Sequence, residues 1–255
     1  MPRLSGKLAL ITGGNSGIGL ATAKAFVAEG ARVAITGLDP DALESARRSI
    51  GNDTLALVSD VADLNAIDAL VAAIRTNFGA LDILFANAGV GTSVPVENTT
   101  EEEFDRVFNV NVKGLFFTVK KTLPLLRNGA SIILNSSIAT RTGTAGLSVY
   151  AASKAAVRTF ARNFSAEFAS RGIRVNVVSP GPIETPIWSS GEATAGLRQR
   201  VEGAVPLGRI GRPEEVARTV VFLASEESSF MLGAEIVVDG GMIELPSGAP
   251  SRRGP

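Results

Sequence analysis

Histidine and cysteine are both missing from this chain of 255 residues, and tyrosine and tryptophan occur once each. A Ser-His-Asp triad, a cysteine nucleophile, a disulfide framework and a zinc site built from His or Cys are therefore excluded. Any general acid or base must be Tyr, Lys, Asp or Glu, and we expect no metal site. The lack of cysteine is compatible with a reducing cytosol, although exported proteins can also lack disulfides.

The chain also lacks an excess of one charge, since Lys and Arg together number 25 and Asp and Glu together number 25. Neither a basic surplus that would favour nucleic acid nor an acidic arm is present. No apolar run approaches membrane-spanning length, and the run before the first glycines is too short for a signal segment. The sequence therefore predicts a cytoplasmic protein that binds neither nucleic acid nor membrane.

Short β-branched apolar runs alternate with segments of helical periodicity, which predicts repeated βαβ units in a single α/β domain. We expect a doubly wound parallel sheet with helices on both faces, formed by residues 1–245. Residues 246–255 are rich in Pro, Gly and Ser and predict a flexible tail. The seven predicted strands are residues 7–13, 32–36, 54–59, 82–87, 130–137, 174–180 and 234–240.

A glycine-rich stretch, TGGNSGIG, follows the first predicted strand and precedes a helical segment. Its glycines let a phosphate approach the backbone N–H groups at a helix N-terminus, where the helix dipole favours negative charge. The spacing G-x3-G-x-G of Gly13, Gly17 and Gly19 differs from the more familiar G-x-G-x-x-G. Taken alone, the stretch is equally compatible with an ordinary turn.

The only tyrosine lies one helical turn before a lysine, in the stretch SVYAASK. Positions i and i+4 share one face of a helix, so Tyr150 and Lys154 are expected side by side. Taken alone, this pair favours a packed ring beneath a lysine stem. Its meaning depends on the motifs around it.

Eight motifs, in this order along nearly the whole chain, resemble the short-chain dehydrogenase/reductase family in its compact form. The resemblance implies a Rossmann-type sheet and an NAD(P)-dependent oxidoreductase that transfers a hydride between nicotinamide and a secondary alcohol or ketone. The motifs are TGGNSGIG, DV at 60–61, ANAG at 86–89, NVNVKG around Asn111, SS at 136–137, YAASK at 150–154, PGPIET at 180–185 and VDGG at 238–241.

The resemblance assigns the chemistry to Ser137, Tyr150 and Lys154, with Asn111 holding a water in support. Tyr150 would be the acid and base, and Ser137 would hydrogen-bond the reacting oxygen. A free phenol has a pKa near 10, and the Lys154 cation is expected to favour its ionised form. Ser136 is an alternative to Ser137, but adjacent strand residues face opposite ways and the family interval favours Ser137. Without this context, a helix interruption is the favoured interpretation of Asn111, because Asn competes with helical backbone hydrogen bonds.

The same resemblance implies which residues contact the cofactor, with Lys154 at the nicotinamide ribose. Asp60 is also a residue type that caps helices, and Ala86 replaces an Asn that is common in the family, which is expected to affect stability more than binding. The predicted cofactor residues are Gly13, Asn15, Ser16, Gly17, Ile18, Gly19, Leu38, Asp39, Asp60, Val61, Asn87, Ala88, Gly89, Tyr150, Lys154, Pro180, Gly181, Ile183 and Thr185.

Cofactor choice depends on the end of the second strand, where a carboxylate favours the ribose hydroxyls of NAD and an Arg favours the phosphate of NADP. Gly37 takes the usual acidic place, Leu38 takes the place where many NADP users carry Arg, and Ser16 is not basic either. Asp39 is nearby and repels phosphate, although it equally suits a turn before Pro40. The sequence leans slightly to NAD(H) and leaves NADP(H) open.

Substrate recognition is expected from residues 186–205, a stretch rich in Gly, Ala and Ser that is typical of a mobile lid. We predict that Trp188 contacts the substrate together with Ser137 and Tyr150, although a packing role suits it equally. A neutral, mainly apolar alcohol or ketone would suit the expected pocket. Its other predicted lining residues are Val90, Ile138, Leu147 and Ile183.

The resemblance further implies a homo-oligomer, a tetramer or a dimer, built from the helices after Glu101 and Val149 and the final strand. The stretch AVRTFARNFSAEFA supports this, because its apolar residues recur at helical spacing and exceed what one sheet face needs. The alternative is a wide stripe that faces the core of a monomer. The residues of this stripe are Val157, Phe160, Ala161, Phe164 and Phe168.

Two other functions are compatible with the same fold. One is a catalytically silent nucleotide-binding or scaffold protein, and the intact Ser-Tyr-Lys set argues against it. The other is an epimerase or dehydratase on a related fold, which the compact length disfavours. An alcohol dehydrogenase or ketone reductase is therefore the preferred prediction.

Overall fold

A seven-stranded parallel sheet forms the centre of the protein in a computed structural model that describes residues 2–186 and 192–245. The strand order is β3-β2-β1-β4-β5-β6-β7, and every neighbouring pair is parallel. All seven predicted strands are confirmed, and so is the fold class. The strands are β1 (Leu8–Ile11), β2 (Arg32–Gly37), β3 (Leu55–Val58), β4 (Leu81–Ala86), β5 (Leu126–Asn135), β6 (Arg174–Pro180) and β7 (Glu235–Val238).

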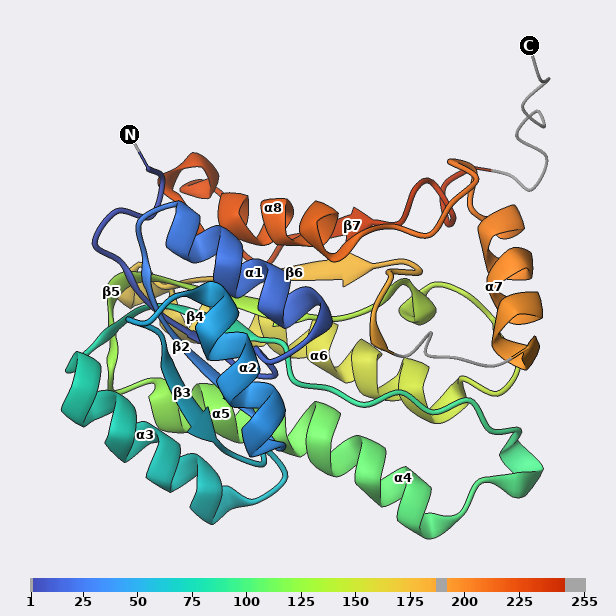
Figure 1. The fold of residues 1–255 in the computed structure, drawn as a ribbon, viewed down its shortest axis with the longest axis horizontal. Coiled ribbons are helices and arrows are strands. Elements are labelled where there is room, and N and C mark those ends of the chain that lie inside the picture. The colour runs from blue at the N-terminus through green and yellow to red at the C-terminus, as the bar shows by residue number, and fades with distance from the viewer. Residues whose placement is uncertain (1, 187–191, 246–255) are drawn as a thin grey trace.

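Helices cover both faces of this sheet (Figure 1). The α-helices are α1 (Gly17–Ala28), α2 (Pro40–Ile50), α3 (Leu64–Phe78), α4 (Glu101–Phe108), α5 (Leu115–Thr122), α6 (Ser148–Phe168), α7 (Glu192–Ala204) and α8 (Pro213–Ala224). A π-helical segment, η2 (Asn109–Gly114), joins α4 to α5. Short 3-10 helices are η1 (Val96–Asn98), η3 (Ile138–Thr140), η4 (Ala169–Arg171) and η6 (Glu226–Ser228).

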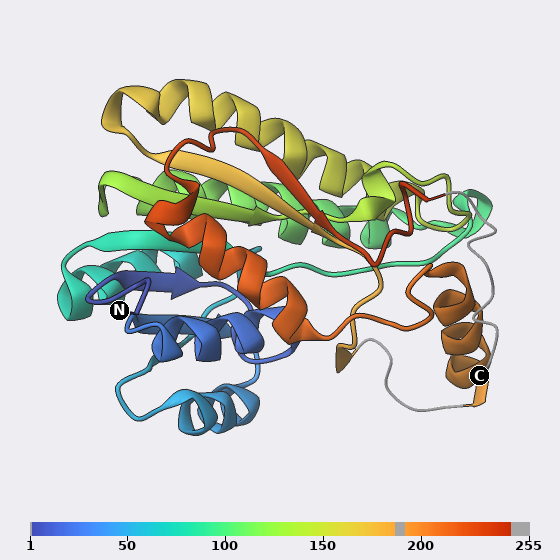
Figure 2. The same ribbon diagram turned by 90° about the horizontal axis from the view of Figure 1, so that it is seen from above.

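Two hydrophobic cores lie on opposite faces of the sheet. Helices α3, α5 and α6 pack on one face, and α1, α2 and α8 pack on the other, with α1 and α8 side by side in both views (Figures 1 and 2). Successive strand residues alternate between the cores, since Ile132 and Leu134 enter one core and Ile133 enters the other. A parallel strand buried on both faces is apolar along its whole length, which explains why the strands were readable as continuous runs.

The apolar stripe of α6 faces the core of its own chain. Val157 and Ala161 are fully buried, Phe164 and Phe168 nearly so, and Phe160 packs against the same core. Consecutive phenylalanine rings of this stripe stack at centroid distances of 5.5 and 5.6 Å. The prediction that this stripe supplies surface for a partner subunit is therefore wrong, and the alternative of a core-facing stripe is confirmed.

Candidate active site

The predicted site residues gather at one edge of the sheet. The glycine loop follows β1, residues 87–89 follow β4, and Ser137 follows β5. The carboxyl ends of parallel strands meet at a common edge, where ligands of open α/β sheets bind. Tyr150 and Lys154 reach this edge from the first two turns of α6, which packs along β6.

The glycine loop is built for close backbone approach. Gly13 and Gly17 have positive φ angles of 63° and 50°, which residues other than glycine rarely adopt. A Cβ atom on Gly19 would lie 2.0 Å from the carbonyl oxygen of Gly13, and one on Gly17 would lie 3.0 Å from Cγ2 of Thr185. A side chain at position 19 would collide with the loop backbone, and one at position 17 would crowd Thr185.

The start of α1 offers backbone donors to an anion. Ser16 occupies the N-cap position, is exposed, and accepts no capping hydrogen bond at its side chain. The first N–H groups of a helix have no partner within the helix, and its dipole is positive there. Ile18 anchors the same turn against the core of α1, α2 and α8. This loop and helix start therefore fit the pyrophosphate of NAD(P).

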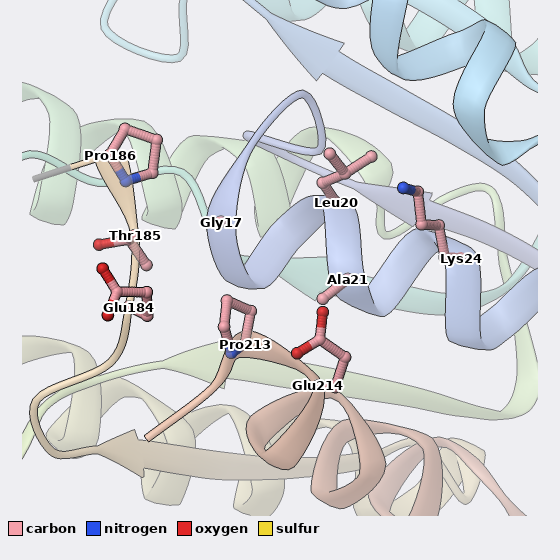
Figure 3. A pocket seen from close by; sticks show the side chains of 9 residues that line it. All are labelled: Gly17, Leu20, Ala21, Lys24, Glu184, Thr185, Pro186, Pro213 and Glu214. Atoms are coloured by element: carbon pink, nitrogen blue, oxygen red, sulfur yellow. The ribbon is translucent and has the colours of Figure 1, made fainter. Parts of the chain in front are cut away.

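A cavity of about 310 Å³ adjoins the glycine loop (Figure 3). Gly17 and Lys24 of α1 line one side of it, Thr185 lines another, and Glu214 of α8 lines a third. Figure 3 shows that the segment carrying Thr185 passes directly opposite the start of α1. The loop after β6 and the loop after β1 thus face one another across this space.

Asn87 ties the glycine loop to its neighbouring strands. Its Nδ2 donates to the carbonyl oxygens of Thr12 at 2.9 Å and Gly13 at 3.1 Å, and its Oδ1 accepts from Nδ2 of Asn135 at 2.9 Å. The backbone N–H groups of Asn87 and Ala88 both donate to Oγ1 of Thr12 at 3.0 Å. The side chain of Asn87 therefore shapes the loop, while the predicted cofactor contact of residues 87–89 stays a prediction.

The space beside the end of β2 is filled by the side chain of Asn15. A Cβ atom on the buried Gly37 would lie 2.8 Å from Cγ and Oδ1 of Asn15, so Asn15 fills the place of an acidic side chain. Leu38 is 65% exposed. Asp39 caps α2, because its Oδ1 accepts from the N–H groups of residues 41 and 42 at 2.8 and 3.1 Å. The turn-forming interpretation of Asp39 is therefore confirmed.

The loop after β3 places Asp60 at the surface. Its Oδ1 accepts from the N–H of Ala62 at 2.8 Å, and Val61 beside it is buried. The cap of α3 is Asp63, which accepts from the N–H of Asn65, so the helix-cap interpretation of Asp60 is wrong. The predicted contact of residues 60 and 61 with the adenine stays a prediction.

Ser137 and Tyr150 meet across the mouth of the site. The two hydroxyl groups are near enough for Ser137 to affect the pKa of Tyr150, and Oγ of Ser137 accepts from the N–H of Ala139 at 3.2 Å. Burial raises the pKa of Tyr150 above its ordinary value of 10, and the Ser137 hydroxyl opposes that rise. The phenol is therefore protonated at neutral pH. An acid that delivers a proton must begin in this state.

Lys154 is a buried cation that is hydrogen-bonded to the backbone of β5. Its side chain is 4% exposed, its Nζ donates to the carbonyl oxygen of Asn135 at 2.9 Å, and the same Nζ lies 5.9 Å from the centroid of the Tyr150 ring. Burial lowers the pKa of Lys154 to about 8. A Cβ atom on Gly89 would lie 3.1 Å from this Nζ, so glycine leaves the space that the ammonium uses.

Asn111 lies in η2, where the helix widens. Its Oδ1 accepts from the N–H of Val90 at 2.8 Å, and its Nδ2 donates to the carbonyl oxygen of Val90 at 2.9 Å and to Oγ of Ser153 at 3.0 Å. Ser153 in turn donates to the carbonyl oxygen of Tyr150 at 2.7 Å. Asn111 therefore lies where the α-helix is interrupted, and it is linked through Ser153 to the backbone of Tyr150. A π-bulge often marks a functional site.

The structure separates the two candidate serines as strand alternation predicts. Ser136 is buried, and its Oγ donates to the carbonyl oxygen of Lys154 at 3.0 Å, so it fastens α6 to β5. Ser137 is the one that reaches Tyr150. Sequence reasoning did not single out Asn135 and Ser153, because their roles depend on contacts between distant segments.

The loop after β6 carries the last predicted cofactor residues. Pro180 ends the strand, and Gly181 lies so close to residue 239 that a Cβ atom on it would be 2.7 Å from that side chain. Ile183 is 6% exposed and packs into the core, whereas Thr185 lies against the glycine loop. Trp188, the predicted substrate contact, lies outside the described residues.

Known proteins that are similar to this chain match it over almost its whole length. A family profile described as enoyl-(acyl carrier protein) reductase matches residues 13–243. An oxidoreductase of Sarocladium schorii is 43% identical over 95% of this chain and 98% of its own length. The NADP-dependent (R)-specific alcohol dehydrogenase of Lentilactobacillus kefiri is 42% identical over 94% of this chain and 97% of its own. The structure of L-sorbose reductase from Gluconobacter frateurii, complexed with NADPH and L-sorbose, is similar with a TM-score of 0.90 at 33% identity, covering 96% of this chain and 100% of that one.

Replacing Gly19 by Ala tests the phosphate cradle. The added methyl group would meet the Gly13 carbonyl oxygen at 2.0 Å, so the loop must shift away from the position that holds a phosphate. We expect the Kd for NADH and NADPH, measured by fluorescence titration, to rise about tenfold or more. Gly143→Ala is the matched control, because nothing lies within 4 Å of its Cβ position. Equal affinities in Gly19→Ala and wild type would contradict the cradle.

Proposed function

Since the chain belongs to the short-chain dehydrogenase/reductase family, we propose that this NAD(P)-dependent oxidoreductase exchanges a proton with a secondary alcohol or ketone through Tyr150. The observation that carries the proposal is the meeting of Ser137 and Tyr150 above the buried ammonium of Lys154. An alcohol oxidation must remove a proton and a hydride, and these three residues handle only the proton. The hydride requires the dinucleotide.

The glycine loop, the start of α1 and the segment ending at Thr185 would hold NAD(P), whose nicotinamide gives or takes the hydride when bound. Ser16 and Gly17 place backbone donors for the pyrophosphate. Thr185 lies across from them. Lys154 would reach the nicotinamide ribose, in keeping with the family resemblance. These contacts are proposals that the geometry of the loop supports.

Tyr150 would act on the oxygen of the substrate. In ketone reduction, its O–H donates a proton to the carbonyl oxygen as that carbon gains a hydride, which leaves a phenolate. In alcohol oxidation, the phenolate takes the hydroxyl proton back. Ser137 accepts from Ala139, so its own hydrogen is free to point at the substrate oxygen or at Tyr150. The Ser137 hydroxyl offsets part of the rise that burial causes in the pKa of Tyr150, and this favours proton release.

Lys154 would supply the positive charge that stabilises the phenolate. In the structure its ammonium is held by the carbonyl oxygen of Asn135, and burial opposes its charge. A developing negative charge on Tyr150 would be attracted to this cation more strongly than in water, because the site is shielded from solvent. The cation therefore acts on the charge that forms during the reaction more than on the resting phenol.

Tyr150→Phe tests the proton transfer. The change removes the hydroxyl and keeps the ring, so we expect kcat to fall about 100-fold or more, in line with the usual contribution of a general acid. The Kd for cofactor should change by less than about twofold, because the ring packing is preserved. Turnover is followed by nicotinamide absorbance with a panel of ketones. A variant that keeps normal turnover would show that Tyr150 is not the acid.

The pKa of Lys154 sets an expected pH dependence. Lys154 is charged below its pKa of about 8 and neutral above it, whereas Tyr150 stays protonated to a higher pH. We therefore expect kcat/KM for ketone reduction to be level near pH 6 and to fall about tenfold per unit above about pH 8. Initial rates across this range at saturating cofactor measure it. A profile that stays level past about pH 9 would contradict the role of the cation.

The cofactor preference is proposed to be set by the end of β2. The slight preference for NAD(H) rests on Asp39, but its Oδ1 is committed to capping α2. NADP(H) is used by a relative that is 42% identical, which supports proposing that both cofactors bind. Asn15 and the exposed Leu38 are then the residues that would contact the adenosine ribose and distinguish the two cofactors.

Leu38→Arg should raise the ratio of kcat/KM for NADPH over NADH by about tenfold, because an exposed position accepts the guanidinium beside a ribose phosphate. Gly37→Asp should favour NADH only when combined with Asn15→Ala, since the Asn15 side chain occupies the space that the new carboxylate needs. Val27→Arg, at the far end of α1, is the control for added charge. Unchanged ratios in both designed variants would reject this placement of the ribose.

A homo-oligomer, a dimer or tetramer, is proposed from apolar residues other than the α6 stripe. Val96 is 72% exposed and Phe104 of α4 is 45% exposed, and the Phe104 ring stacks on Phe108 at 4.5 Å. Phe230 and Leu232, just before β7, are also exposed. Exposed clusters of this kind mark contact surfaces. Light scattering should give a multiple of 26.4 kDa, and an active monomer would contradict the assembly.

The lid proposed for residues 186–205 receives support from one ion pair. Arg198 of α7 donates through Nη1 to Oε1 of Glu184 at 2.8 Å and also pairs through Nη2 with the other oxygen. Both side chains are close to half exposed, so the pair is weak enough to open. This contact joins α7 to the loop that carries Thr185. Closing and opening of α7 over the substrate is the motion that we propose.

The proposed substrate is a neutral small molecule with a secondary alcohol or ketone. Relatives of this chain include galactitol and sorbitol dehydrogenases at 38% and 36% identity, alongside the alcohol dehydrogenase.

Among residues 2–186 and 192–245, no helix is long and apolar enough to cross a lipid bilayer. The cytoplasmic location and the absence of nucleic-acid partners stay predictions from the sequence.

A further inference from the structure

Glu235 is a buried carboxylate at the edge of the sheet, outside the residues described so far. It lies in β7, the strand that runs beside β6 (Figure 2), and its side chain is only 7% exposed. A buried carboxylate without partners would be strongly unfavourable, so its neighbours need to supply charge and hydrogen bonds. Three side chains do so, and each comes from a different element.

The three partners of Glu235 surround both carboxylate oxygens. Oε2 pairs with Nη2 of Arg141 at 2.5 Å and with Nε of Arg158 at 2.7 Å. Oε1 accepts from Oγ of Ser179 at 2.6 Å. The guanidinium of Arg141 also pairs with Glu244 at 3.4 Å, and the side chain of Glu244 is 73% exposed. Asp239 lies near enough to help raise the pKa of Arg141.

Each partner is tied closely to a group of the proposed site. Arg141 follows η3, and its N–H donates to the carbonyl oxygen of Ile138 at 2.8 Å, one turn after Ser137. Arg158 lies four residues after Lys154 on α6, and so on the same face of that helix. Ser179 immediately precedes residues 180 and 181. Glu235 therefore connects the turn that follows Ser137, helix α6 and the end of β6 at one point.

The connection through Arg141 matters most for Ser137. Residues 141 and 143–145 are exposed, so little packing holds this part of the chain in place. Oγ1 of Thr140 donates to the carbonyl oxygen of Ser137 at 3.0 Å, and Ser137 caps η3, so η3 moves as one turn with the serine at its start. A carboxylate that holds Arg141 at the end of this turn fixes the position of Ser137 at its beginning.

We propose that Glu235 is a positioning residue, which acts through Arg141 to hold Ser137 at hydrogen-bonding distance from Tyr150 and the substrate oxygen. The inference rests on the proposed function, because it assumes that Ser137 contacts the reacting oxygen. Glu235 itself touches neither substrate nor cofactor in this scheme. A displacement of a reacting group by about 1 Å can cost about 100-fold in rate, so a distant anchor can control turnover.

Glu235→Gln tests this role because it removes the charge and preserves the shape. With saturating cofactor and a ketone substrate, we expect kcat to fall about tenfold, while the Kd for NADPH changes less than about twofold. Glu244→Gln removes the exposed second partner of Arg141 and is the matched control, with kcat within about twofold of wild type. Arg141→Met should lower kcat as Glu235→Gln does, and the double variant should be no slower than either single variant, because both break one coupling.

A kcat for Glu235→Gln equal to that of wild type, measured well below its melting temperature, would overturn the proposal and leave Glu235 a purely structural residue. Additive losses in the double variant would overturn it as well. If Glu235→Gln does not fold, Arg141→Met decides in the same way, since the pair between Glu235 and Arg158 persists there. Failure of the proposed function is distinct, because wild type would then reduce no ketone and Tyr150→Phe would change nothing.

Discussion

The buried ammonium of Lys154 is the constraint around which the site is arranged. A lysine that is 4% exposed needs a hydrogen-bond acceptor, and the carbonyl oxygen of Asn135 provides one at 2.9 Å. That bond sets the distance between α6 and the end of β5, which Ser136 reinforces by donating to the lysine carbonyl. The same ammonium requires glycine at position 89, since a Cβ atom there would lie 3.1 Å from Nζ.

Asn135 also links the surroundings of Lys154 to the glycine loop. Asn135 accepts from Lys154 through its backbone and donates through its side chain to Asn87, which holds the glycine loop. The proton-transfer half and the nucleotide-binding half are thus connected by two hydrogen bonds. Asn135 is buried, with 9% of its surface exposed. Its Oδ1 nevertheless has no hydrogen-bond partner within the described part of the chain.

The sheet and the core of the site were predictable for a physical reason. Strands covered on both faces give uninterrupted apolar runs, and a conformational requirement such as the positive φ of Gly13 and Gly17 restricts the residue type directly. That Tyr150 and Lys154 lie side by side was predictable from helical spacing, whereas their role in the site was implied by the family resemblance. These features are local, so the sequence carries them within a few residues.

The features that were missed depend on what another segment supplies. The stripe of α6 gives the same pattern whether a sheet or a partner subunit covers it, and only the fold shows that Phe164 and Phe168 are in the core. That Asn15 fills the space beside Gly37 could not be predicted either, because the two residues belong to different segments. The role of Glu235 could not be predicted from the sequence, because it depends on contact with Arg141, nearly a hundred positions earlier.

The energetic cost of the site falls on the same lysine. Burial moves the pKa of Lys154 from 10.5 to about 8, so the folded state holds the proton less tightly than the unfolded state. Below about pH 8 this amounts to about 3 kcal/mol against folding, and the cost diminishes as pH rises toward 10.5, where the unfolded chain also loses its proton. A neutral side chain of similar length would remove that cost, but it would also remove the only buried lysine beside Tyr150 among the described residues. Where a phenolate must form, stability at neutral pH is given up for a cation that water does not screen.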